Sequence, residues 1–185
     1  MEIAGIIRNR WSPRAFTEEK MNRDEVRSLF EAARWAPSSM NEQPWKYYFA
    51  LREDSDKFKK FLDCLVPFNQ QWAKNASLLI LSTAKKHFVY KNKPNRHAMH
   101  DTGAANSFIC LQANELGYQA HQMGGFKSGE TYSAFNIDEN EYELVSFIAV
   151  GKTGHPSILP EDLRKSELSP RERKNIEEIV DGIIV

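Results

Sequence analysis

Two apolar runs constrain the fold of this chain more than any other feature. Ala76–Thr83 and Leu144–Val150 each have the length of a β-strand, and neither alternates between apolar and polar residues. Continuous apolar strands are typical of the middle of a sheet that is covered on both faces. The chain is therefore expected to fold around a buried sheet with helices on both sides.

Apolar residues with helical spacing predict the helices that would cover this sheet. Asn22 and Glu25 have the spacing of a capping box at the start of one helix, which should end near Pro37. Small residues at Gly103 to Ala105 would let another helix approach the longest periodic stretch closely. The segments with helical spacing are residues 3–7, 26–33, 58–65 (ended by Pro67) and 97–116.

The remaining segments complete the fold prediction. Residues 45–50 alternate as a half-buried strand does, and residues 119–121 indicate a short strand. Without a regular βαβ repeat, this pattern predicts an α+β fold with a central mixed, mainly antiparallel sheet covered by helices. We expect a single domain over residues 1–185, an exposed loop at 85–95, and an apolar tail at 179–185 that packs on its own domain or on a second subunit.

Composition excludes several classes of function. The 25 basic and 25 acidic side chains cancel, which argues against nucleic acid or an anionic membrane as partner. No window approaches the roughly 18 apolar residues of a membrane span, and residues 1–10 lack the apolar run of a signal peptide. Cys64 and Cys110 form no CxxC pair, so buried thiols are expected rather than a disulfide or zinc site. A reducing, cytoplasmic setting fits these features.

Arg10, Ser12 and Arg14 form the first candidate site. They occupy alternate positions of a predicted loop, so two guanidinium groups and a hydroxyl would point the same way in an extended chain. Paired arginines suit the geometry of a phosphate group. The alternative is an ordinary basic loop in solvent.

Three further segments are candidates for ligand contacts. Residues 36–45 join a helix to a strand and offer backbone groups and short polar side chains to a planar polar ligand, although an ordinary turn has the same composition. Gly124 and Gly125 would let the backbone approach a ligand, or form a simple turn. Residues 171–174 are a charge run that is either solvated or completes a phosphate site.

In their order along the chain, these segments resemble the signatures of the nitroreductase family. The most specific is the string from Pro37 to Trp45, Pro-Ser-Ser-x-Asn-x-Gln-Pro-Trp. Residues 101–105 and 111–113 are also similar to the central helix of that family, so the resemblance covers nearly the whole chain. It implies an NAD(P)H-oxidising enzyme that binds FMN non-covalently at the interface of a homodimer.

The resemblance also implies roles for individual residues. The residues implied to bind the FMN phosphate or ribityl chain are Arg10, Ser12, Arg14, Ser39, Arg171 and Arg173. Those implied to contact the flavin ring are Pro37, Ser38, Asn41, Asn69, Met123, Gly124 and Gly125. Some relatives have a lysine shortly after the position of Asn69, where this chain has Trp72, and loss of that cation would change the flavin potential or the substrate bound.

The implied activity is transfer of hydride from NADH or NADPH, through the flavin, to a small electron acceptor such as a nitroaromatic or quinone. No side chain is assigned as a general acid or base, and His97 and His100 lack a third partner for a metal. The sequence lacks GxSxG and GxGxxG strings, which argues against a hydrolase and a Rossmann site. Two alternatives stay open: a protein that stores, senses or delivers FMN, and a binder of another phosphate-containing metabolite.

Overall fold

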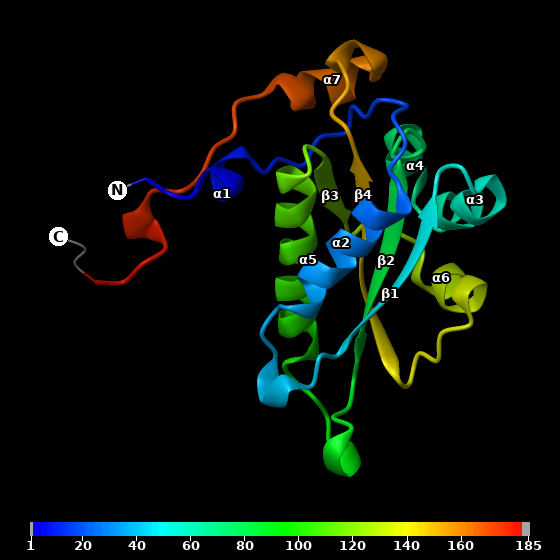
Figure 1. Ribbon diagram of the computed structural model, residues 1–185, viewed down its shortest axis with the longest axis vertical. Coiled ribbons are helices and arrows are strands. Elements are labelled where there is room, and N and C mark those ends of the chain that lie inside the picture. The colour runs from blue at the N-terminus through cyan, green and yellow to red at the C-terminus, as the bar shows by residue number, and fades with distance from the viewer. Residues whose placement is uncertain (1, 183–185) are drawn as a thin grey trace.

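The computed structural model describes residues 2–182, which fold around a four-stranded sheet with helices on both faces (Figure 1). The strands are β1 (Trp45–Leu51), β2 (Leu78–Lys85), β3 (Gln119–Met123) and β4 (Tyr142–Gly151), in the order β1-β2-β4-β3. Each neighbouring pair is antiparallel, and a bulge interrupts the β2–β4 register between Ser82 and Thr83. The predicted α+β class with a mainly antiparallel sheet is confirmed.

The two apolar runs form the two central strands, as predicted. In β2, Leu79 and Leu81 point into one hydrophobic core and Leu78 and Ile80 into the other. All four side chains are fully buried. Burial on both faces explains why the sequence of this strand does not alternate.

Helices α2 (Arg23–Arg34) and α5 (Ala98–Glu115) cover one face of the sheet. The predicted capping box is present: the Asn22 side chain accepts the N–H of Glu25 at 2.9 Å, and the Glu25 carboxylate accepts the N–H of Asn22 at 2.8 Å. These bonds satisfy amide groups that a helix N-terminus leaves unpaired. Thus α2 begins at a defined residue and directs its apolar stripe onto α5 and the sheet.

The opposite face is covered by α3 (Ser55–Asp63), α4 (Pro67–Ala73) and α6 (Ser128–Phe135). Pro67 was expected to end a helix, but it is also the first residue of α4. A proline suits that position because the first amide of a helix needs no internal partner. This short helix brings Asn69 and Trp72 under the sheet, where both are buried.

The segment 85–95 is less exposed than the sequence indicated. Its main chain folds back on itself, with the N–H of Phe88 bonded to the carbonyl of Lys93 at 2.8 Å and the N–H of Asn95 bonded to that of Lys86 at 2.7 Å. Asn95 is buried, and the tip is the short helix η2 (Tyr90–Asn92). The prediction of an exposed loop therefore holds for Val89, for Tyr90 and for residues 92–94, whereas residues 85–88 are half-buried and Asn95 is buried at the base of the segment.

The chain ends in α7 (Glu161–Leu168) and an extended C-terminal arm, residues 169–182, which contains the short helix η4 (Ile176–Glu178). The arm leaves the body beside α1 (Gly5–Asn9), at the left of Figure 1, and exposes Ile176 and Ile179. The last residues of the predicted apolar tail, 183–185, lie outside the described residues. Both cysteines are buried free thiols, as predicted, and no helix within residues 2–182 is long and apolar enough to cross a membrane.

Candidate functional site

Arg10 and Ser12 lie together in the loop that follows α1. Nη1 of Arg10 donates a hydrogen bond to Oγ of Ser12 at 3.0 Å. Both residues line a cavity of about 430 Å³ between this loop, α5 and β3. We call it the phosphate-side cavity, after the phosphate contacts predicted for Arg10 and Ser12. Its other lining residues are Ile7, Ser107, Cys110, Leu111 and Gln122.

Arg14 is fixed through its main chain. The buried carboxylate of Glu167, on α7, accepts the N–H of Arg14 at 2.8 and 3.1 Å and the N–H of Ala15 at 3.0 Å. The guanidinium Nε of Arg14 is buried and has no hydrogen-bond partner among residues 2–182. Leaving such a donor unsatisfied is costly, and an anion that accepts its hydrogen would remove this cost.

His121 belongs to the same cluster, although the sequence did not single it out. Its Nδ1 lies 3.0 Å from the carbonyl of Pro13, and its ring packs 4.6 Å from that of Trp72. Burial lowers the pKa of His121 to about 4, and the charges of Arg14 and Arg10 act in the same direction. The imidazole is therefore neutral near pH 7 and contributes a rigid support for the loop.

Asn69 and the Gly124-Gly125 pair form a second part of the site. Nδ2 of the buried Asn69 donates to the carbonyl of Gly125 at 3.0 Å, which leaves Oδ1 of Asn69 as an acceptor for a ligand. A Cβ at Gly125 would lie 2.7 Å from Nδ2 of Asn69, whereas a Cβ at Gly124 would meet nothing within 4 Å. The structure thus places open space over Gly124. The Met123 side chain is buried in the core, so Met123 offers this space only main-chain atoms.

The turn that holds Ser38, Ser39 and Asn41 is strained. Non-glycine residues rarely adopt positive φ, yet φ is 56° at Met40, 54° at Asn41 and 50° at Gln43. Such conformations cost free energy and cluster at functional sites.

Two polar contacts hold this turn. The buried Asp101 carboxylate accepts the N–H of Ser39 at 2.9 Å, and Oγ of Ser38 accepts the N–H of Gln43 at 3.0 Å. The exposed Pro37 lies at the start of the turn. The turn, residues 37–43 around the short helix η1 (Ser39–Asn41), is therefore tied to the first turn of α5.

The turn and the phosphate-side cavity lie at different levels of α5. Asp101 anchors the turn, while Ser107 and Cys110 line the cavity six and nine residues later, a rise of about 9 to 13 Å along the helix. None of the residues that line the cavity comes from the turn. One chain therefore brings Arg10 and Ser12 together, but it does not join them to Ser38, Ser39 and Asn41.

The two C-terminal arginines lie on the exposed arm. Nη2 of Arg171 donates to the carbonyl of Arg8 at 3.1 Å, next to Ile7 of the phosphate-side cavity. Nη1 of Arg173 donates to the carbonyl of Glu172 at 2.6 Å. The structure thus places Arg171 close to the rim of the cavity, without contact to Arg10 or Arg14.

A buried polar network supports the cavity from within. The fully buried Asn106 donates to Oγ of Ser82 at 2.9 Å and to Oγ of Ser146 at 3.2 Å, and accepts the hydroxyl of Tyr47 at 3.0 Å. Its amide also lies 3.4 Å from Oε1 of Gln122, which lines the cavity. A single Asn in a periodic helix gives no sign of such a network in the sequence.

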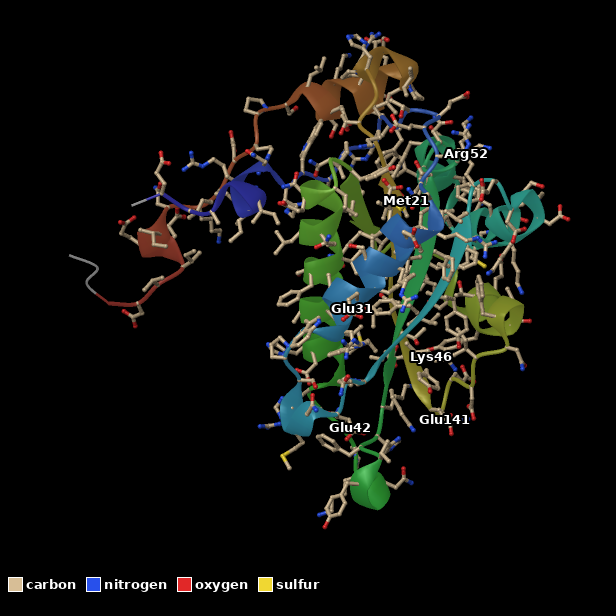
Figure 2. The ribbon with its side chains drawn as sticks, viewed as in Figure 1. Met21, Glu31, Glu42, Lys46, Arg52 and Glu141 are labelled. Carbon is tan, nitrogen blue, oxygen red and sulfur yellow. The ribbon has the colours of Figure 1, made fainter. Side chains whose placement is uncertain are left out.

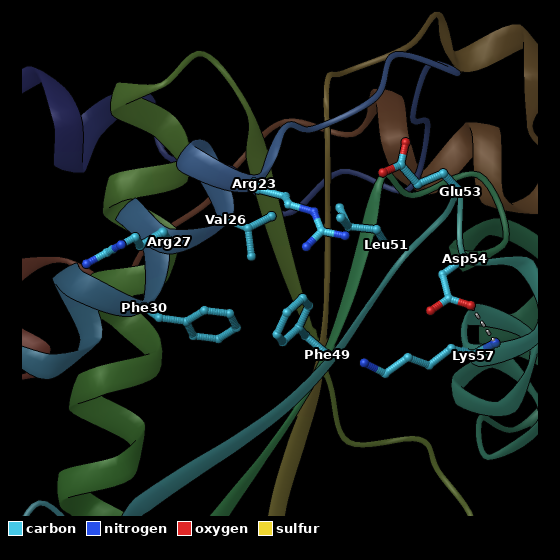
Figure 3. A pocket seen from close by; sticks show the side chains of 9 residues that line it. All are labelled: Arg23, Val26, Arg27, Phe30, Phe49, Leu51, Glu53, Asp54 and Lys57. Atoms are coloured by element: carbon cyan, nitrogen blue, oxygen red, sulfur yellow. Dashed lines mark hydrogen bonds between the residues drawn. The ribbon is translucent and has the colours of Figure 1, made fainter.

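A separate cavity of about 470 Å³ lies between α2 and the outer edge of β1 (Figure 3). Val26, Phe30, Phe49 and Leu51 form its apolar floor, and charged side chains surround them. The charged residues are Arg23, Arg27, Glu53, Asp54 and Lys57. None of the predicted site residues lines it.

Comparison with known proteins identifies the relatives of this chain. A family model described as "Nitroreductase family" matches residues 7–152. The "CLA biosynthesis enone reductase" of Lactiplantibacillus plantarum is 23% identical, over 85% of this chain and 88% of that protein. The "Putative NAD(P)H nitroreductase YdgI" of Bacillus subtilis (strain 168) is 25% identical, over 72% of this chain and 79% of that protein.

A solved structure gives the same result. A protein described as an "oxidoreductase containing FMN" superimposes with a TM-score of 0.92 and is 33% identical, over 98% of this chain and 91% of that one. The match extends over both halves of the candidate site, since the aligned region includes the N-terminal loop and the strained turn. The chain belongs to the nitroreductase family.

Proposed function

We propose that this protein is an FMN-dependent oxidoreductase that couples oxidation of NADH or NADPH to reduction of a small electron acceptor. The buried, unpartnered Nε of Arg14 and the nearby Arg10–Ser12 pair in the same loop carry the proposal, because an anionic ligand such as a phosphate would supply the partner that Nε lacks. The FMN content of the 33% identical relative and the NAD(P)H nitroreductase name of YdgI support it.

The residues present fit the cofactor. Arg10, Ser12 and Arg14 would hold the phosphate, with Arg171 and Arg173 closing the site from the arm. Asn69, Gly124, Gly125 and the main chain of Met123 would contact one edge of the flavin, and Pro37, Ser38, Ser39 and Asn41 would contact it from the turn. When bound, FMN supplies two-electron chemistry that no side chain can provide.

We further propose a homodimer in which each site takes its turn residues from the second chain. None of the residues that line the phosphate-side cavity comes from the turn of the same chain, and a turn supplied by the second chain would complete the site. Met99 and Met40 are exposed near the turn, and the arm exposes Ile176 and Ile179. A second copy would cover these apolar side chains.

The acceptor is proposed to be a small conjugated molecule. The relatives in the comparison are named for an enone and for nitro compounds, respectively, which share a polarised π-system that accepts electrons. The protein would position this acceptor and exclude competing reactions, and we assign no side chain as a general acid or base.

Anaerobic stopped-flow mixing tests the proposal. The purified protein should be yellow, and its absorbance near 450 nm should bleach with NADH or NADPH and return on addition of a quinone or nitroarene. Yellow protein that neither nucleotide bleaches would favour storage or delivery of FMN. Protein that stays colourless after incubation with FMN would favour a different phosphate-containing ligand.

A further inference from the structure

A small cavity of about 310 Å³ lies between the strained turn and the 85–95 segment. Its lining residues are Met40, Glu42, Phe88, Tyr90 and Lys93. In Figure 2, Glu42 lies between the η1 helix and the η2 tip at the bottom of the molecule. The volume is at the lower end of the roughly 300–1,000 Å³ range of small-molecule sites, so it suits a ligand of about one ring.

The cavity adjoins the proposed cofactor site at Met40. Met40 lies between Ser39 and Asn41, both assigned to the cofactor, and its own side chain lines the cavity instead. The positive φ of Met40 gives its side chain a direction that differs from those of Ser39 and Asn41. A ligand in this cavity would therefore lie one side chain away from the cofactor residues.

A hydrogen bond joins the turn to the 85–95 segment at this cavity. The carboxylate of Glu42 accepts the N–H of Val89 at 2.6 Å, and this bond ties the turn to the tip of the 85–95 segment. The bond engages Glu42 with the main chain. Among the described residues that line the cavity, Lys93 then supplies the charged donor that can face a ligand.

We infer that this cavity binds the electron acceptor, and that it selects a planar aromatic ring carrying an anionic substituent. Phe88 and Tyr90 offer ring faces and edges for stacking, Met40 offers a polarisable thioether, and Lys93 offers a positive charge. This inference rests on the proposed function and makes Phe88 and Lys93 its specificity-determining residues.

Direct binding tests the cavity without turnover. We would measure dissociation constants of benzoate and of its neutral analogue benzamide by isothermal titration calorimetry on the FMN-loaded protein. Wild type should bind benzoate about fivefold more tightly, as expected for a partly exposed ion pair, and Lys93→Met should remove this preference. Lys59→Met, which removes an exposed ammonium on α3 far from the cavity, should retain it. Phe88→Leu should weaken both ligands about fivefold.

The second measurement is reoxidation of the reduced protein by 4-nitrobenzoate and 4-nitrobenzamide. Lys93→Met should slow reoxidation by the anionic acceptor about fivefold more than reoxidation by the neutral one. Equal affinity of wild type for benzoate and benzamide, or a preference that survives Lys93→Met, would overturn the inference. Failure of the proposed function would look different, because the protein would then bind no FMN or would not be bleached.

Discussion

Nδ1 of His121 lies 3.0 Å from the carbonyl oxygen of Pro13, so the imidazole holds the main chain between the two proposed phosphate ligands Ser12 and Arg14. A carbonyl only accepts hydrogen bonds, and Nδ1 must therefore carry the proton. The pKa of this group is lowered to about 4, mainly by burial. The loop that would bind the phosphate is thus supported by a histidine that stays neutral.

This histidine predicts a pH dependence of stability. The folded pKa is about 4 and the unfolded pKa about 6.5, so the unfolded state binds more protons between these values. The free energy of unfolding should fall as pH drops from about 6.5 to about 4, by up to about 3 kcal/mol. Urea denaturation of the apoprotein across this range would measure it. His121→Gln should flatten the dependence, and the exposed His155→Asn should not; an equal slope in His121→Gln and wild type would contradict the assignment.

The phosphate cluster predicts ligand-selective losses of affinity. Arg14→Ala and Arg173→Ala should each weaken FMN by about one to two decades, since a charge-assisted contact contributes about 1.5 to 3 kcal/mol. Riboflavin has no phosphate and should change less. Flavin fluorescence titration would measure both ligands, with Arg14→Lys as the charge-conserving variant and the exposed Arg164→Ala as control. Equal loss for FMN and riboflavin would mean that these arginines do not bind the phosphate.

Asp101 predicts the opposite pattern, because it supports the turn rather than the phosphate cluster. Its carboxylate accepts the N–H of Ser39 at 2.9 Å and lies 2.9 Å from Nδ1 of His100. Asp101→Ala should release the strained turn and weaken FMN and riboflavin alike, by about tenfold. Asp101→Asn keeps an acceptor for Ser39 and should lose less. The same titrations would test this prediction. Unchanged affinity of Asp101→Ala for riboflavin, the ligand without a phosphate, would contradict it.

Two neighbouring glycines predict contrasting outcomes. A Cβ at Gly124 meets only open space, so Gly124→Ala should leave the thermal stability of the apoprotein unchanged yet lower its affinity for FMN. A Cβ at Gly125 would press on Asn69 and Val66, so Gly125→Ala should lower both. Differential scanning fluorimetry with and without FMN separates the cases. Unaltered FMN affinity in Gly124→Ala would place the flavin elsewhere.

The C-terminal arm predicts the oligomeric state. Light scattering should give twice the chain mass for the full protein, and deletion of residues 170–185 should shift it toward the monomer and weaken FMN. Ile179→Asp tests the same contact at a single side chain. Because Ile179 is exposed in the single chain, the substitution should weaken the dimer without unfolding the chain. A monomeric full-length protein that still binds FMN tightly would refute the shared site.

The elements with strong local signals were predictable from the sequence. The apolar run of β2, the periodicity of α5 and the capping box of α2 each depend on residues close together in the chain, and all three are present in the structure. Weaker signals failed. The sequence does not predict the seven-residue helix α4, because Pro67 signals the end of the preceding helix as readily as the start of a new one. It does not predict α7 either, because only Leu163 and Glu167 of this polar helix are buried.

In the candidate site, too, residues within short strings were predictable, whereas contacts between distant residues were not. Family-like strings predicted its residues, and the structure brings Arg10 to Ser12 and Asn69 to Gly125. The supporting residues depend on contacts between positions far apart in the sequence. The Glu167 carboxylate is hydrogen-bonded to the main chain of Arg14, and the His121 ring to that of Pro13. No short string encodes such contacts. Whether every predicted residue touches FMN stays a prediction.

The position of the turn and the phosphate-side cavity at two levels of α5 also bears on how the protein behaves when dilute. In the proposed homodimer, assembly and cofactor binding are linked equilibria, and each ligand that bridges two chains favours their association. The flavin would then be retained at high protein concentration and released on dilution. At a given concentration of free FMN, a cell that makes little of this protein would therefore hold a larger share of it colourless than a cell that makes much of it.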